Sequence, residues 1–265
     1  MFSDSFLYKK VVSPDKSDWL DQNGEIMVYF SLNAIVDVFN IEVANSILLG
    51  LLREYESKQI SLRYLLKALN TIEKYHFINN AISSNRSSGL DTMYAKFSRN
   101  IMEASTKHNK HTEIDRMITK LSERVPAETE YLANFDEKVY YTKKDTKQKK
   151  LVQYVLRKIE MKAQNDNIDL LSMSIEHVYP ETPNENWNNI NDEDLIKNIG
   201  NLVFLDSGLN SLIGNKNYEK KKEIIIEKST LISTKEVFNK NEVWSEASIK
   251  LRRDEIAGLM YDGIW

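Results

Sequence analysis

The residues best suited to chemistry in this chain are a carboxylate and a histidine standing side by side, Glu176 and His177, followed further along by Asn201 and Asn210. A neutral imidazole can take a proton from water near pH 7. Carboxylate and amide oxygens are ligands that a hard cation such as Mg²⁺ or Mn²⁺ accepts, and so few protein ligands leave most of the coordination shell to water and substrate oxygens. These residue types predict metal-assisted hydrolysis of a phosphodiester at a site built around His177.

We expect each residue of this set to have a different task. His177 is the candidate general base, and Glu176 the candidate metal ligand, either directly or through water. Asn201 is expected to join the loop after His177 to the next strand and so to orient the imidazole. The metal-binding amide is Asn210 or Asn215, and Asn210 is favoured because it lies closer to the end of that strand.

Lysines gather near the candidate site. Asn215 is followed by Lys216, Lys220 and Lys221, which we expect to support the site or to bind phosphate, and a second basic run lies within residues 143–150. Each contact between a lysine and a phosphate adds salt-dependent affinity for DNA. The net charge of −3 nevertheless argues against a protein that coats nucleic acid without specificity. The alternative is that both runs are solvated helix faces.

Short strands are predicted to position the candidate residues. Residues 170–178 are too apolar and too few for a surface helix, and residues 201–206 form the best strand pattern of the chain. An Asn-rich loop with Pro180 and Pro183 separates them, and it is followed by one helical turn capped by Asp192. After the second strand, Ser207 and Gly208 are expected to begin a helix that carries both candidate asparagines and the lysines. The order is strand, long loop, strand, helix.

Helical spacing dominates the rest of the sequence. Apolar residues recur with this spacing in three segments within residues 31–75, in residues 92–105, 112–124 and 147–162, and again in residues 234–265. Ser61 is a candidate N-cap, and residues 80–90 form a predicted loop. Trp244 and Trp265 are expected to be packing anchors. The predicted fold class is therefore mainly α, with a helical domain over residues 1–165 and the small strand-containing unit, embedded in helices, over residues 166–265.

Composition restricts the class of protein further. The chain of 265 residues has 28% charged and 42% hydrophobic residues, with few Gly and Pro, as in a globular helical protein. It has no cysteine, which excludes disulfides and thiolate zinc sites. No apolar segment is long enough for a membrane span and the N-terminus has no signal-peptide pattern. We expect a cytoplasmic protein that does not contact a membrane.

The pattern also resembles a known family over residues 151–265. The similarity rests on Ser174–Pro180, Ile199–Leu205 and Gly214–Lys216, with Trp187, Leu209, Asn210, Tyr218, Lys221, Trp244, Ile249, Arg252 or Arg253, Ile264 and Trp265. Together these are similar to the C-terminal HNH-type, or ββα-metal, domain of the GmrSD family of modification-dependent restriction endonucleases. The resemblance implies a metal-dependent DNA endonuclease or nickase that acts in bacterial restriction and antiviral defence.

The resemblance also raises the question of a partner. Proteins of that family begin with a ParB-like nucleotide-hydrolysing module that carries an Asp-Gly-Gln-Gln-Arg motif, and neither this motif nor a Gly-rich phosphate loop occurs here. We therefore expect either a C-terminal fragment or a split subunit whose NTPase partner supplies recognition. A regulatory or DNA-binding subunit that cuts only with this partner is the alternative to an autonomous nuclease. With one site per chain, a homodimer would be needed to cut both strands.

Overall fold

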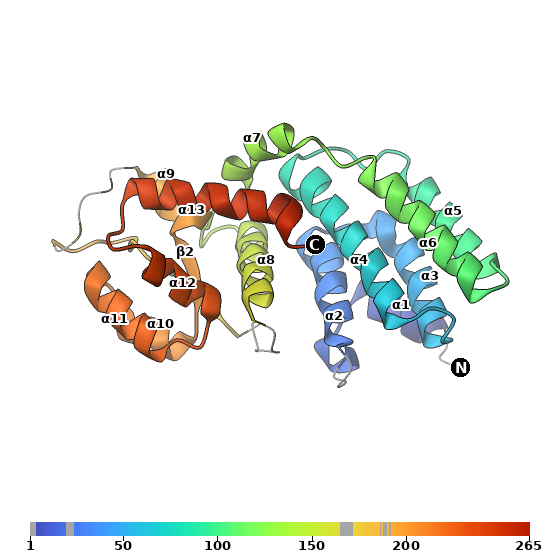
Figure 1. Cartoon of the computed structure of the whole chain (residues 1–265), viewed down its shortest axis with the longest axis horizontal. Coiled ribbons are helices and arrows are strands. Elements are labelled where there is room, and N and C mark those ends of the chain that lie inside the picture. The colour runs from blue at the N-terminus through green and yellow to red at the C-terminus, as the bar shows by residue number, and fades with distance from the viewer. Residues whose placement is uncertain (1–3, 20–23, 165–171, 186, 188–189, 191) are drawn as a thin grey trace. The chain divides into compact units, whose positions relative to one another are not determined.

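The computed structural model describes residues 4–19, 24–164, 172–185, 187, 190 and 192–265 (Figure 1). Its helices and strands are α1 Asp4–Val12, α2 Ile26–Asn33, α3 Asn45–Glu56, α4 Leu62–His76, α5 Leu90–Glu103, α6 Lys107–Ser122, α7 Glu128–Lys138, α8 Thr146–Ala163, β1 Ser174–His177, α9 Glu193–Lys197, β2 Leu202–Leu205, α10 Ser207–Ile213, α11 Tyr218–Lys228, α12 Ile232–Lys240 and α13 Glu246–Gly258. The predicted fold class is confirmed: the chain is mainly α with a small ββα unit.

The chain divides into two compact units, residues 1–131 with Trp265 and residues 132–264. Helix α8 belongs to the second unit because it packs on α12 and β2. The sequence led us to expect a helical domain over residues 1–165 and a nuclease-like domain over residues 166–265. That assignment of domains stays a prediction. None of the helices in the described part of the chain is long and apolar enough to cross a membrane.

The first unit is built from amphipathic helices whose apolar faces meet. Helix α3 packs on α5, and α4 packs on α2 and α6. The apolar residues that indicated helices here are fully buried, among them Ile47 and Leu51 on α3 and Leu65 and Leu69 on α4. Ser61 caps α4 as predicted, because its hydroxyl accepts a hydrogen bond from the Tyr64 amide.

The second unit holds a two-stranded antiparallel sheet. Ser174 pairs with Leu205 and His177 with Leu202, so β1 ends where β2 begins. The first residues of the segment predicted as this strand lie outside the described residues. All four residues of β2 are buried, and α12 packs against this strand. Helix α10 follows β2 and contacts β1, which completes the ββα unit.

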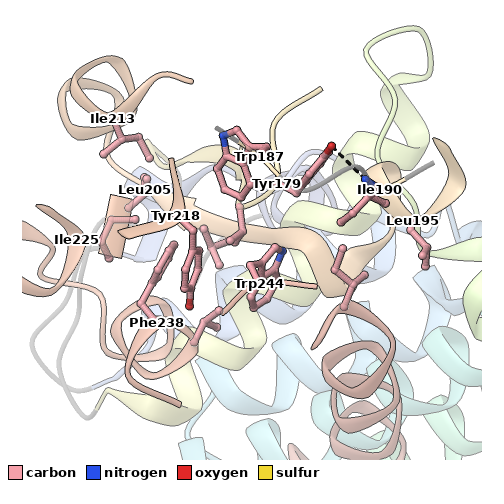
Figure 2. Close-up of a cluster of buried hydrophobic side chains, with 14 of the residues drawn as sticks. Tyr179, Trp187, Ile190, Leu195, Leu205, Ile213, Tyr218, Ile225, Phe238 and Trp244 are labelled. Carbon is pink, nitrogen blue, oxygen red and sulfur yellow. Dashed lines mark hydrogen bonds between the residues drawn. The ribbon is translucent and has the colours of Figure 1, made fainter. Parts of the chain in front are cut away.

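An apolar cluster in the second unit packs three described residues of the segment between the strands against β2 and the helices (Figure 2). It joins Tyr179, Trp187 and Ile190 of the loop to Val203 and Leu205 of β2 and to side chains from α10, α11 and α12. The Ile190 amide donates a hydrogen bond to the hydroxyl of Tyr179. Because the aromatic side chains of Tyr179 and Trp187 are buried in this cluster, the chain just after β1 is packed against β2 and the helices.

One predicted helix is two helices in the structure. The segment after β2 was expected to continue from Ser207 through the lysines, but α10 ends at Ile213 and α11 begins at Tyr218. Gly214 has a φ of 44° at the break, a conformation that favours glycine. Asn217 then caps α11 by accepting a hydrogen bond from the Lys220 amide. Asn215 therefore lies in a turn and not on a helix.

Candidate active site

A polar cleft of about 320 Å³ lies at the end of β1. Four segments line it: the turn before α8, the end of β1, the turn after β1 and the turn between α10 and α11. The lining residues are Tyr141, Lys143, Ile175, Glu176, His177, Pro180, Glu181, Thr182, Gly214 and Asn215. The strand end thus brings Glu176 and His177 into the same cleft, although neighbouring strand residues point to opposite faces.

His177 is held in this cleft as a neutral base. The residue is only 8% exposed, and its Nε2 has no hydrogen-bond partner among the described residues. The ring of Tyr141 packs edge-on against the imidazole, 5.4 Å between centroids. Burial lowers the pKa of His177 to about 4; Glu181 opposes this shift, while Lys221 and Lys143 add to it. The imidazole is therefore unprotonated near pH 7, as a general base must be.

Glu176 is bound to a buried lysine. Its Oε1 lies 2.6 Å from Nζ of Lys221, whose side chain is fully buried. Burial raises the pKa of Glu176 and lowers that of Lys221, and the attraction between the two opposes both shifts. The same ammonium donates to the carbonyls of His177 and Val178. Lys221 is therefore a buried residue that binds the end of β1, and its ammonium group is not exposed for contact with phosphate.

Asn201 is a buried tie between the loop and the second strand. Its Oδ1 accepts hydrogen bonds from the Tyr179 amide and from Nε1 of Trp244. Its Nδ2 donates to the carbonyls of Tyr179 and Ile196. Both the oxygen and the nitrogen of this side-chain amide are hydrogen-bonded within the protein, and the residue is fully buried. The side chain of Asn201 thus holds the backbone of Tyr179, two residues after His177, in place.

The two asparagines considered as metal ligands lie at different places. Asn210, in α10, donates a hydrogen bond to the hydroxyl of Ser174, at the end of β1 remote from His177. Asn215 lines the cleft and donates through Nδ2 to the carbonyl of Thr182. The structure therefore brings Asn215 together with His177, and it places Asn210 beside the start of β1.

The remaining lysines predicted near the site are exposed. Lys216 donates to the carbonyl of Leu212, and Lys220 pairs with Glu223 one turn along α11. Such surface pairs contribute little to stability. Lys216 lies on the surface in the turn that carries Asn215, and Lys220 is exposed on the first turn of α11, so neither is buried as Lys221 is.

Sequence reasoning did not connect some of the residues that line the cleft with the motif, although Lys143 belongs to the basic run noted at residues 143–150. Tyr141 and Lys143 come from a turn far from the motif in sequence, and only the fold brings them to it. Glu181 was not singled out, although it stands four residues after His177; its Oε1 lies 3.9 Å from Nε2 of His177. Burial alone would raise the pKa of Glu181, but Lys143 and His177 together lower it. The feature of the sequence that could have indicated Glu181 is a carboxylate four residues after the histidine.

The donors of the cleft have the chemistry that a hard cation accepts. Two carboxylates, those of Glu176 and Glu181, and the amide of Asn215 line one small space together with His177. Oxygen ligands of this kind suit Mg²⁺. Within the part of the chain that the structure describes, no three His, Cys, Asp or Glu side chains gather closely enough to hold a metal by themselves. Water and substrate oxygens must therefore complete any coordination shell here.

Comparison with known proteins identifies the family to which the segment with this cleft is similar. A search of curated proteins finds no match. Residues 125–259, half of the chain, match the family described as GmrSD restriction endonucleases, C-terminal domain. The matched segment contains the cleft, both strands and the buried residues that hold them. The chain accordingly belongs to the family of GmrSD restriction endonucleases, through their C-terminal domain.

Proposed function

We propose that this chain is a metal-dependent DNA endonuclease or nickase, with His177 as the general base, acting in bacterial restriction and defence against phage. The observation that carries the proposal is the state of His177: a buried, neutral imidazole in a cleft shared with Glu176, Glu181 and Asn215, whose Nε2 has no hydrogen-bond partner in the described part of the chain. Membership of a restriction endonuclease family gives the substrate, DNA.

The roles follow from position. Nε2 of His177 takes the proton from the attacking water, which general base catalysis requires. Glu176, Glu181 and Asn215 are the residues that would hold Mg²⁺ or Mn²⁺, and the bound cation would neutralise charge on the scissile phosphate and the leaving oxygen. Lys221 fixes Glu176 and the end of β1, and Asn201 fixes the loop after it. Both act by keeping the base and the carboxylate in place.

Two expectations from the sequence extend the proposal. The first is a partner or further module that hydrolyses nucleotide and recognises the DNA to be cut. The second is that two chains act together for a double-strand break, since the described part of one chain has one cleft with His177 and can therefore cut one strand at a time. Activity that rises when such a partner is added would support the first, and a nick as the first product of the isolated chain would support the second.

Cleavage of supercoiled plasmid by the full chain tests the proposal. We expect nicking with Mg²⁺ or Mn²⁺, none with EDTA, and a loss of about 100-fold or more for His177→Gln, because glutamine keeps most of the volume but cannot accept the proton. His177→Ala should behave alike. Circular dichroism and thermal unfolding of both variants establish that they fold. Cleavage at the wild-type rate by a folded His177 variant would reject the proposal.

A further inference from the structure

Lys143 is the lysine that enters the cleft from outside the motif. It lies in the turn between α7 and α8, its side chain is 71% exposed, and Nζ is 2.5 Å from Oε2 of Glu181. Its neighbour Lys144 is also exposed but does not line the cleft. Lys216, Lys220 and Lys221, by contrast, point their ammonium groups at a helix carbonyl, at Glu223 and into the interior. Of the lysines near the site, Lys143 therefore faces the space where a substrate must lie.

Glu181 occupies the middle of a short line of groups. One of its oxygens binds Lys143, and the other lies 3.9 Å from Nε2 of His177. A scissile phosphate must come close to this nitrogen, because the water that attacks the phosphorus gives its proton there. The negative charge of Glu181 alone opposes the approach of the phosphate, whereas Lys143 attracts it.

Exchange of one anion for another at Lys143 is energetically easy. The pair with Glu181 is largely exposed, 71% and 40% for the two side chains, and exposed ion pairs contribute little to stability. A lysine bound to phosphate makes a charge-assisted hydrogen bond and releases a counterion from the DNA, which favours the complex at low salt.

We propose that Lys143 binds a phosphate group of the DNA strand in the cleft, and that Glu181 holds this lysine in the DNA-free protein. The inference rests on the proposed nuclease function and adds a substrate-binding residue to it. In the complex Lys143 contacts the backbone and Glu181 is released, so that its carboxylate is available for a cation next to His177. The contact is with the backbone, so it carries no base specificity.

Binding of a fluorescein-labelled DNA duplex to the full chain, in EDTA so that nothing is cut, tests this inference. Lys143→Ala should weaken binding severalfold and reduce the slope of log affinity against log salt by about one. Glu181→Gln should strengthen binding, and this gain should be smaller when Lys143 is also alanine, because the substitution then removes only the repulsion between Glu181 and the phosphate. Lys144→Ala is the matched control, with the same charge lost from the same turn, and should lose less affinity than Lys143→Ala. Equal losses for the two lysines, or an unchanged salt slope for Lys143→Ala, would overturn the inference.

Plasmid cleavage separates this inference from the nuclease proposal. If the wild type cuts and His177→Gln does not, the nuclease stands whatever Lys143→Ala does to binding. In that case we expect Lys143→Ala to raise KM with little change in kcat, because the lost contact is made before and during the reaction alike. An unchanged KM would be a failure of the inference alone. A wild-type chain that neither binds nor cuts DNA contradicts both.

Discussion

Nζ of Lys221 lies 2.6 Å from Oε1 of Glu176, and it also donates to the carbonyls of His177 and Val178. The side chain of Lys221 is fully buried, while that of Glu176 is 15% exposed. One ammonium thus joins the carboxylate beside the base to the backbone at the end of β1. Since both charges are withdrawn from water, each depends on the other.

Removal of the ammonium should therefore destabilise the protein strongly. Lys221→Met keeps the length of the side chain but leaves the carboxylate of Glu176 and two carbonyls without their donor. We expect a loss of about 3 kcal/mol in the free energy of unfolding, measured by urea denaturation. The double variant Lys221→Met/Glu176→Gln should recover part of this loss, because no buried charge remains.

Lys220→Met is the control for the loss of a lysine from α11. Lys220 is exposed and, among the described residues, its ammonium pairs with Glu223, so we expect Lys220→Met to change the free energy of unfolding by less than about 0.5 kcal/mol. A Lys221→Met protein as stable as Lys220→Met would show that the pair with Glu176 contributes little.

Substitution of Asn201 should mainly reduce stability, whereas substitution of Asn215 should mainly reduce activity. Asn201→Ala removes a hydrogen-bond partner from four polar groups on Tyr179, Ile196 and Trp244, three of which are buried, and we expect a loss of about 3 kcal/mol or more in urea denaturation. Asn215 is exposed in the cleft, so Asn215→Ala should cost less than about 1 kcal/mol and yet slow plasmid cleavage. The reverse pattern would contradict the roles assigned to the two asparagines.

The sequence predicts the elements of the site better than the site itself. Adjacent Glu176 and His177, and Asn201 directly before the next strand, are local features whose spacing indicates β1, the loop and β2. The cap at Asp192, whose side chain accepts from the Asp194 amide, is likewise set by neighbours in sequence. Features that depend only on neighbouring residues can be predicted from the sequence, because tertiary packing does not alter them.

Other parts of the site depend on contacts between distant segments. Nothing near Lys221 in sequence shows that it is an interior residue, because its neighbours Lys220 and Lys222 are also lysines and only packing distinguishes them. The break at Gly214 moves Asn215 from a helix into the cleft, and a helical pattern of apolar residues does not reveal such a turn. Lys143 reaches the cleft through the path of the turn before α8.

Gly200 should tolerate no side chain. A Cβ at this position would lie 2.1 Å from the carbonyl oxygen of Ile249 and 3.1 Å from the Arg253 amide, both in the backbone of α13. Backbone cannot move aside as a flexible side chain can, so Gly200→Ala should cost about 1–3 kcal/mol or more in the free energy of unfolding. It should also reduce cleavage, because Gly200 directly precedes Asn201.

Gly258→Ala is the matched control in α13. A Cβ there meets nothing within 4 Å, and alanine favours helix over glycine by up to about 1 kcal/mol, so this variant should be equally or more stable than wild type. Thermal unfolding of the two variants compares them directly. Similar losses for both would mean that α13 does not need its close approach to the turn at Gly200.

His76 should make the first unit less stable in acid. It is fully buried, with Nδ1 2.6 Å from Oδ1 of Asn80 and Nε2 2.9 Å from the hydroxyl of Tyr94. Burial lowers its pKa from 6.5 to about 4, against a smaller raising effect of Asn80. Between these two values the unfolded chain binds a proton that the folded chain does not, so stability is complete above pH 6.5 and falls as the pH drops toward 4.

The expected loss from His76 is about 2 kcal/mol on going from pH 7 to about pH 5. His177 shifts in the same direction, so His76→Gln should remove only part of the acid sensitivity of the whole chain. Urea denaturation at both pH values measures the difference, with His108→Gln as the matched control because His108 is exposed on α6. If His76→Gln loses as much stability in acid as the wild type, His76 is protonated in the folded protein and its buried position does not govern the response.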